Sequence, residues 1–487
     1  MASKLFKHGL IYSVAQLTAA LAGLISFPIL TKNLSIDEYG AVALFTTTIG
    51  LLTSFNKFGI QHSIIRFYKT LTHSELISNF LPTIVISLIF SSIVIFLIGG
   101  CLSLVSNLPV FHLQSLSILV SCAFLQSVQS YCQNLLVAME KSYTVAIIES
   151  GYRLLSLSTV VIAILLINPS YQQFTYAILS ADLILCLCIV FLMYKRGIFN
   201  GFDMEKVNKV HIKTIVIFGL PMMGYELSKM VHAFIDRFFI DFFLGSRALG
   251  LYTVPYNMAM IIGGLLLSGL ATAVVPHYLS IWKEQGKQAT EKTLSEINDY
   301  LLLLSPAIIT GLYLISEPLI SLLTTPEYVS FAFLLPIIAT GVILSNSSIL
   351  YAAGMQINKN SRGIFQYVFE SMMINIVLNI LAIPIFGIVA AAVNTVISYS
   401  WMAMRFHFKS RQTLKITFNF WVLVRSSLYS LAMYLIVIQI NFDLHINTLL
   451  FRGVTGGLIF ATLVLIFEKS FRQSSLRFIK ISSKTAV

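Results

Sequence analysis

Ionisable side chains recur every three or four residues within one strongly apolar stretch of this chain, residues 214–240. At that spacing Glu226, Lys229, His232 and Asp236 share one face of a helix, and Arg237 flanks that face. An ionisable group among apolar residues is costly, so it normally pairs with an opposite charge or faces a cavity. Two interpretations are open. One is an ion ladder that pairs Glu226 with Lys229 and His232 with Asp236; the other is a cavity-lining site for substrate or protons.

Other apolar stretches contain polar groups of the same kinds. Glu149 and Arg153 stand four residues apart, as either a buried intrahelical pair or a functional pair. Asp182 is a candidate partner for Arg153 or a proton site. Three glutamines on one helical face fit either interhelical packing or hydrogen bonds to sugar hydroxyls; they are Gln126, Gln129 and Gln133. The candidates for ion coupling are Glu226, His232, Asp236, Asp182, Glu149 and Glu370.

The cations in these stretches indicate the charge of a substrate. Arg153, Lys229 and Arg237 suit an anionic headgroup such as a pyrophosphate, because several N–H donors can bind it at once. A cavity for a cationic drug would favour carboxylates and aromatic rings instead. The predicted substrate is therefore anionic.

Membrane-spanning helices must position these residues. The 487 residues are 57% hydrophobic and 11% charged, whereas soluble domains contain roughly 25% charged residues. A helix needs about 20 apolar residues to span a bilayer. Fourteen stretches have a suitable length: 9–31, 40–56, 80–105, 111–138, 143–167, 172–194, 214–240, 248–275, 297–316, 329–353, 364–386, 388–405, 418–439 and 447–468. The sequence thus predicts an all-α polytopic membrane protein.

The basic residues fix an orientation for these spans. With the N-terminus in the cytoplasm, 25 of the 32 Lys and Arg residues fall in cytoplasmic segments, and only Lys32 and Arg247 fall in outer loops. Positive charge favours the cytoplasmic side, so both termini are predicted to be cytoplasmic. The net charge of +12 is the sum of these segments, which face anionic lipid headgroups, and it requires no nucleic acid.

Weak internal similarity divides the chain into two halves. A shift of 210 residues places Gly9-Leu10 on Gly219-Leu220 and Gly40 on Gly250. Two pseudo-symmetric lobes of six spans each are predicted, with two further spans at the C-terminal end. The predicted segments are an N-terminal lobe (1–195), a cytoplasmic linker (196–213), a C-terminal lobe (214–405), and the last two spans with a basic tail (406–487). An even number of spans per lobe makes the repeats parallel, which suits alternating access between the lobes.

Signatures of catalysis are missing from the sequence. No P-loop, His-Glu-x-x-His, Cys-x-x-Cys or Gly-x-Ser-x-Gly motif occurs, and the five cysteines have no metal-binding spacing. The outer loops are short, whereas a membrane polymerase usually needs a sizeable one. We therefore expect a secondary transporter, with no cofactor, rather than an enzyme.

Three segments resemble a known family. They are SFPILTKNLSIDEYGAVALF (26–45) followed by FGIQHSIIRFY (58–68), the long segment from Phe218 to Ala259, and NIVLNILAIPIFGIVAAAVNT (375–395). All resemble the Wzx-type lipid-linked oligosaccharide flippases, polysaccharide transporters of the MOP superfamily.

The resemblance implies a fold and a function. The implied fold has fourteen spans in two lobes, with the V shape of MATE transporters. The implied function is translocation of undecaprenyl-pyrophosphate-linked repeat units, such as those of O-antigen and lipopolysaccharide, across the bacterial inner membrane. Ion coupling and cooperation with a polysaccharide polymerase or chain-length machinery are expected from the same resemblance. The alternative is a cation-coupled multidrug or small-molecule exporter of the same superfamily.

Overall fold

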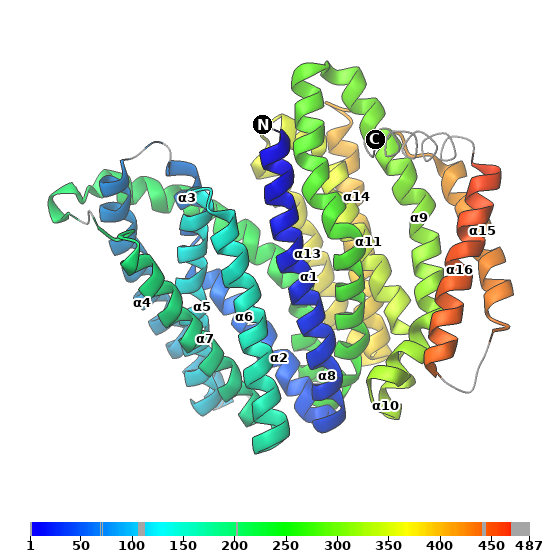
Figure 1. Ribbon diagram of the computed structural model, residues 1–487, viewed down its shortest axis with the longest axis horizontal. Coiled ribbons are helices and arrows are strands. Elements are labelled where there is room, and N and C mark those ends of the chain that lie inside the picture. Colours follow the sequence, from blue (N-terminus) through cyan, green and yellow to red (C-terminus); the bar gives the residue numbers. More distant parts are fainter. Residues whose placement is uncertain are drawn as a thin grey trace, which may run out of the picture. The chain divides into compact units, whose positions relative to one another are not determined.

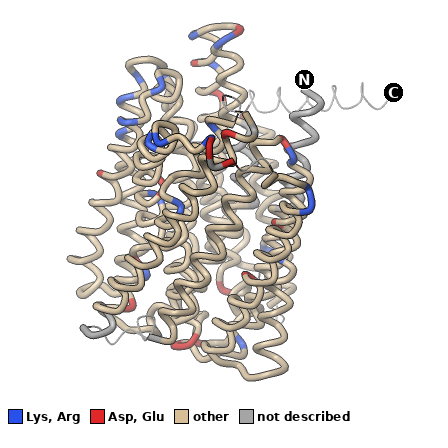
Figure 2. Tube along the Cα trace, turned by 90° about the vertical axis from the view of Figure 1, so that its left-hand side faces the viewer, with Lys and Arg blue, Asp and Glu red and all other residues tan. Residues whose placement is uncertain are grey.

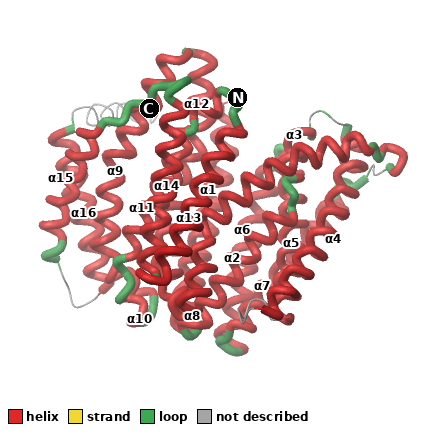
Figure 3. The backbone as a smooth tube through the Cα atoms, turned by 180° about the vertical axis from the view of Figure 1, so that it is seen from behind, coloured by secondary structure: helices red, strands yellow, loops and turns green. Residues whose placement is uncertain are grey.

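The computed structural model describes residues 2–68, 70, 72–105, 113–200, 203–440 and 445–468. Within these ranges the chain forms helices joined by short turns, and no strand (Figure 1, Figure 3). The predicted outer loop at 106–110 and the basic tail from residue 469 lie outside the described residues.

The helices follow the apolar pattern of the sequence. The α-helices are α1 (Ala2–Asn33), α2 (Ile36–Asn56), α3 (Ile60–Phe67), α4 (His73–Val105), α5 (Leu113–Ala138), α6 (Ser142–Ile162), α7 (Tyr171–Lys195), α8 (Lys209–Glu284), α9 (Gly286–Leu323), α10 (Pro326–Val329), α11 (Leu334–Tyr351), α12 (Ala353–Ile357), α13 (Ser361–Phe386), α14 (Ile388–Ser410), α15 (Phe420–Val437) and α16 (His445–Phe467). A π-helical turn at Ala163–Ile167 continues α6, and a 3₁₀ turn lies at Met204–Lys206.

Each of the fourteen predicted spans overlaps a helix, and several helices extend beyond the predicted span, most clearly α9. Nine described helices are long and apolar enough to cross a membrane. The other predicted spans lie on α1, α2, α14 and the long α8, which contains two of them. Figure 2 shows long middle sections of helix with few Lys, Arg, Asp or Glu residues. The all-α membrane architecture is confirmed.

Two glycines mark the tightest connections between predicted spans. Gly245 interrupts α8 with a φ of 83° and a ψ of 168°, between the two spans that this helix contains. Gly387, with a φ of 64°, is the single residue between α13 and α14. A positive φ is open to glycine at little cost, so each chain reversal needs no longer loop.

The described residues form two compact units. The first comprises those of 1–253 and 365–394, and the second those of 254–364 and 395–468. In the first unit α5 packs against α4, α6 and α7, and in the second α9 packs against α11, α15 and α16 (Figure 1). The lobe boundaries derived from the repeat remain a prediction.

The start of α2 shows how sequence fixes one helix end in the first unit. Ser35 and Glu38 form a capping box: the Glu38 amide donates to Ser35 Oγ (3.2 Å), and the Ser35 amide donates to Glu38 Oε2 (3.2 Å). These two bonds satisfy backbone donors that the first helical turn leaves unpaired. The helix therefore begins at Ile36, before the apolar stretch from residue 40.

Candidate functional site

Helices α2 and α8 run antiparallel along each other in the first unit. The contacting pairs, in order along α2 and the following α3, are Gly40 with Ser246, Thr47 with Arg237, Gly50 with Met230, Ser54 with Glu226, Gly59 with Gly219 and Ser63 with Ile215. The residue numbers rise on one side as they fall on the other. We call this contact the α2–α8 interface.

Glycines allow the two backbones to approach closely at both ends of the α2–α8 interface. A Cβ atom at Gly40 would lie 1.9 Å from the backbone oxygen of Ser246, and one at Gly250 would lie 2.3 Å from that of Ile36. At the other end, a Cβ at Gly59 would lie 2.0 Å from Gly219 O. Real Cβ atoms do not approach an oxygen so closely, so the contact depends on the absence of side chains.

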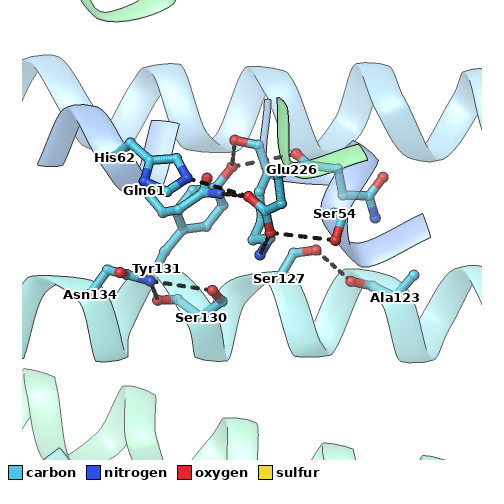
Figure 4. Close-up of polar contacts among 11 residues, drawn as sticks. Ser54, Gln61, His62, Ala123, Ser127, Ser130, Tyr131, Asn134 and Glu226 are labelled. Carbon is cyan, nitrogen blue, oxygen red and sulfur yellow. Dashed lines mark hydrogen bonds and ion pairs between the residues drawn. The ribbon is translucent and has the colours of Figure 1, made fainter. Parts of the chain in front are cut away.

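Four polar residues gather around the carboxylate of Glu226 between these ends (Figure 4). Lys57 Nζ lies 2.6 Å from Glu226 Oε1, and Gln61 Nε2 donates to Oε2 at 2.5 Å. His62 Nε2 lies 3.4 Å from Oε2, and Ser54 Oγ lies 3.4 Å from Oε1. We call Ser54, Lys57, Gln61, His62 and Glu226 the Glu226 cluster.

A break between α2 and α3 brings these donors together. Phe58 has a φ of 47° and Gly59 a φ of 68°, so the chain turns sharply after Lys57. The hydroxyl of Tyr131, on α5, donates to the carbonyl of Lys57 at 2.9 Å and supports the turn. Donors from the end of α2 and the start of α3 therefore reach the same carboxylate.

The central ion pair of the Glu226 cluster is largely shielded. The side chains of Lys57 and Glu226 are 13% and 23% exposed. Removing charges from solvent is expensive, and their attraction offsets that cost only when further hydrogen bonds satisfy them. Gln61 and Ser54 provide such bonds to Glu226.

A second buried group lies further along the α2–α8 interface. The Tyr252 hydroxyl donates to Asp236 Oδ2 at 2.5 Å, and the Arg237 amide donates to Oδ1 at 2.8 Å. The Arg237 guanidinium donates to Thr47 Oγ1 at 2.6 Å and stands over the Phe234 ring at 4.9 Å. Asp236 and Arg237 are both buried, so these contacts replace the water they would otherwise bind.

Replacing Tyr252 with Phe is expected to lower the free energy of unfolding by about 1–3 kcal/mol, because it removes a donor from the buried Asp236 carboxylate. Thermal unfolding of the purified protein in detergent measures this loss. The control is Tyr143→Phe, which removes the hydroxyl of a tyrosine that is 69% exposed. Equal effects of the two substitutions would contradict a supporting role for Tyr252.

The first half of the predicted ion ladder is wrong. Glu226 pairs with Lys57, and Lys229 is instead an exposed side chain with its Nζ 5.7 Å from the Tyr225 ring centroid. A lysine from another helix is closer to the carboxylate than the one on the same face. His232 is buried, with Nε2 3.4 Å from Ser371 Oγ.

Asp182 lies among amide groups. Its Oδ2 accepts from Gln126 Nε2 at 3.0 Å, its backbone oxygen accepts from Gln129 Nε2 at 2.8 Å, and its Oδ1 has no hydrogen-bond partner among the described residues. The contacts of Gln126 and Gln129 favour interhelical packing over sugar binding, whereas Gln133 is half-buried. Arg153, the predicted partner, is exposed beside the Tyr152 ring at 5.8 Å.

The remaining predicted residues are half-buried. Glu149 lies on α6, four residues before Arg153. Glu370 Oε1 accepts from Gln366 Nε2 at 3.0 Å. A buried chain of amides follows on α13 and α14, in which Asn394 donates to Asn379 (2.9 Å) and Asn379 to Asn375 (3.0 Å).

Sequence reasoning missed Lys57, Gln61, His62 and Tyr252. Lys57 was assigned to a cytoplasmic connection because it follows an apolar stretch, and Gln61 and His62 fell in the same connection. Gly59 and Gly219 were the available signals for this contact, because glycines permit two backbones to approach closely.

Comparison with known sequences gives a consistent result. The family model described as polysaccharide biosynthesis protein matches residues 5–282, more than half of the chain. The chain is 22% identical over 343 residues to an Lsg locus protein of Haemophilus influenzae, covering 69% of this chain and 81% of that protein. It is also 22% identical over 251 residues to a protein of Haloferax volcanii named as a probable low-salt glycan biosynthesis flippase, Agl15 (50% and 52%).

Solved structures show the same fold. The lipid II flippase MurJ in an inward closed conformation matches with a TM-score of 0.77 at 16% identity, over 95% of this chain and 99% of MurJ. A multidrug resistance MATE family transporter of the MOP superfamily, in an inward-facing conformation, matches with a TM-score of 0.63 at 14% identity, over 82% and 94%. The chain therefore shares the fold of these two transporters.

Proposed function

This chain belongs to the polysaccharide biosynthesis protein family, and we propose that it is a Wzx-type flippase. The proposed cargo is an undecaprenyl-pyrophosphate-linked oligosaccharide, such as an O-antigen or other lipopolysaccharide repeat unit. The observation that supports transport is the Glu226 cluster, in which charged groups from helices distant in sequence meet within an apolar fold. Such groups are rare in membranes and commonly mark transport pathways.

The proposed location is the bacterial inner membrane, with both termini in the cytoplasm. The 25-to-2 division of Lys and Arg between alternate connections supports that orientation. A polysaccharide polymerase or its chain-length machinery is the proposed partner, since it would consume the translocated repeat unit.

Lys229 and Arg153 are the proposed cargo-binding cations. Both are exposed side chains within predicted membrane spans, and each has a tyrosine ring as its described neighbour. A pyrophosphate presents several acceptor oxygens, which ammonium and guanidinium groups bind strongly. Arg237 is already held by Thr47 and Phe234, so we assign it to support of the α2–α8 interface instead.

Asp182 is the proposed site of ion coupling, with a proton as the ion. Its side chain is fully buried, and its Oδ1 has no described hydrogen-bond partner. Ionisable residues inside membrane spans commonly form proton relays in transporters.

Loss of the protein is expected to stop surface polysaccharide and leave its lipid-linked repeat unit in the inner leaflet. The reason is that the chain has transport architecture without a catalytic motif.

In the deletion strain, the Lys229→Ala variant is expected to fail to restore surface polysaccharide. The Lys229→Arg variant is expected to restore part of it, because arginine keeps the positive charge but changes its geometry. Extraction of lipid-linked sugars and immunoblots of surface polysaccharide measure both effects.

Two outcomes would contradict the proposed flippase. A strain that never assembles the repeat unit would indicate an enzyme.

The second candidate is a cation-coupled multidrug exporter, favoured by the uncompensated Asp182 carboxyl and the MATE fold. Normal polysaccharide with raised drug accumulation would support that exporter. Lys283→Ala, an exposed cation of the second unit, is the control for general loss of charge.

A further inference from the structure

An apolar groove is lined mainly by residues of α4, α5 and α7 in the first unit. Its volume is about 420 Å³, within the range of ligand-binding cavities. The floor includes Leu76, Phe80, Leu88 and Met193, each at most 3% exposed. Tyr131 also lines it, and the Tyr131 hydroxyl is engaged with the Lys57 carbonyl. The groove offers hydrocarbon contacts and no free polar group among the residues named.

One side of the groove is open. Val85 and Ile89 of α4, Phe124 of α5 and Val190 of α7 line it and are 37–53% exposed. Helix α4 is the most apolar of the candidate spans, and only 22% of its most apolar 18-residue stretch is buried. We expect these exposed apolar side chains to face lipid, so that an acyl chain enters from the bilayer without crossing a polar surface.

Positive charge gathers at one end of the groove. Phe199, which lines that end, belongs to the segment 195–213, which contains five basic and two acidic residues. Lys206 Nζ donates to Ser74 Oγ at 3.0 Å, and the Asp203 amide donates to Ser78 Oγ at 2.8 Å, so the segment is fastened to the start of α4. The Lys206 side chain is 48% exposed, and its contact with Ser74 places it two residues from the lining residue Leu76.

We propose that this groove binds one acyl chain of an anionic phospholipid, with the headgroup at the basic segment 195–213. The apolar floor excludes water, and the adjacent cations attract a phosphate-bearing head. This site contains none of the residues of the Glu226 cluster, although Tyr131 contacts both, and its occupant is distinct from the proposed cargo. Its occupant is a membrane lipid that supports the first unit rather than a molecule in transit.

A matched pair of substitutions on α4 tests the groove. Ile84→Trp fills it, whereas Ile86→Trp adds the same volume to a side chain that is 65% exposed and does not line it. Native mass spectrometry of the full-length protein, titrated with phosphatidylglycerol, measures binding. Ile84→Trp is expected to weaken the tightest site roughly tenfold, the effect of displacing about two methylenes, and Ile86→Trp to leave it unchanged.

A second pair tests the headgroup. Lys206→Gln is expected to reduce the preference for phosphatidylglycerol over phosphatidylcholine with identical chains, and Lys283→Gln is not. The proposal is overturned if the two tryptophan variants bind phosphatidylglycerol equally. It is also overturned if undecaprenyl phosphate displaces phosphatidylglycerol from this site at equimolar concentration, because the groove would then belong to the cargo.

Discussion

Lys57→Gln is expected to lower the free energy of unfolding by about 3 kcal/mol, near the low end for one partner of a buried ion pair. The substitution leaves the shielded Glu226 carboxylate without its cation, although Gln61 and Ser54 still donate to it. The double variant Lys57→Gln, Glu226→Gln is expected to be more stable than Lys57→Gln, because neither charge is then stranded. Thermal unfolding in detergent, combined as a double-mutant cycle, measures the coupling.

Lys229→Gln is the control for this cycle. Lys229 is exposed and does not pair with Glu226, so its neutralisation is expected to change stability by less than about 0.5 kcal/mol. The described pairing would be contradicted if the losses in unfolding free energy for Lys57→Gln and Glu226→Gln were additive. Coupling between Lys229→Gln and Glu226→Gln would instead support the ion ladder.

Gly59→Ala is expected to abolish most folded protein, with a cost of about 3–5 kcal/mol. Part of that cost is the left-handed backbone, since Gly59 has a φ of 68° and an alanine there is strained. The rest is a forced separation of backbones, because the new Cβ would lie 2.0 Å from Gly219 O. Size-exclusion chromatography with a fluorescent fusion measures the folded fraction in membranes.

Gly151→Ala serves as the matched control on α6 of the same unit. Apart from the neighbouring residues and backbone of its own helix, no atom lies within 4 Å of the added Cβ. The yield of folded protein is therefore expected to be retained. Gly219→Ala adds a methyl group to the same contact from α8, with its Cβ 2.7 Å from Phe58 O. This variant is also expected to give little folded protein. Wild-type yield for Gly59→Ala would show that the α2–α8 interface tolerates a wider spacing.

The helices were predictable because bilayer length and apolar composition are local properties of the sequence. Even the single-residue connection at Gly387 followed from the pattern. The partner of Glu226 was not predictable in this way. Helical periodicity relates a residue to neighbours three or four positions away, and it placed Lys229 beside Glu226. The actual cation comes from another helix.

The pairing of Lys57 was also missed for a physical reason. Positive-inside reasoning treats a lysine after an apolar stretch as solvated, and most such residues are. Lys57 ends α2, which packs against α8, and the turn at Phe58-Gly59 then brings Gln61 to the same carboxylate. Long-range pairing of this kind has no signature in local composition.

The ion pair has a consequence for biosynthesis. Lys57 and Glu226 are separated by 169 residues. At about 5–20 residues per second, a ribosome needs roughly 10–30 s to synthesise that length, during which α2 is made but α8 is not. Throughout this interval Lys57 lacks its carboxylate partner, and the nascent N-terminal helices must hold it near water or lipid headgroups. A transcript truncated before Glu226 would therefore yield a product with a stranded cation, an expected target for membrane quality-control proteases.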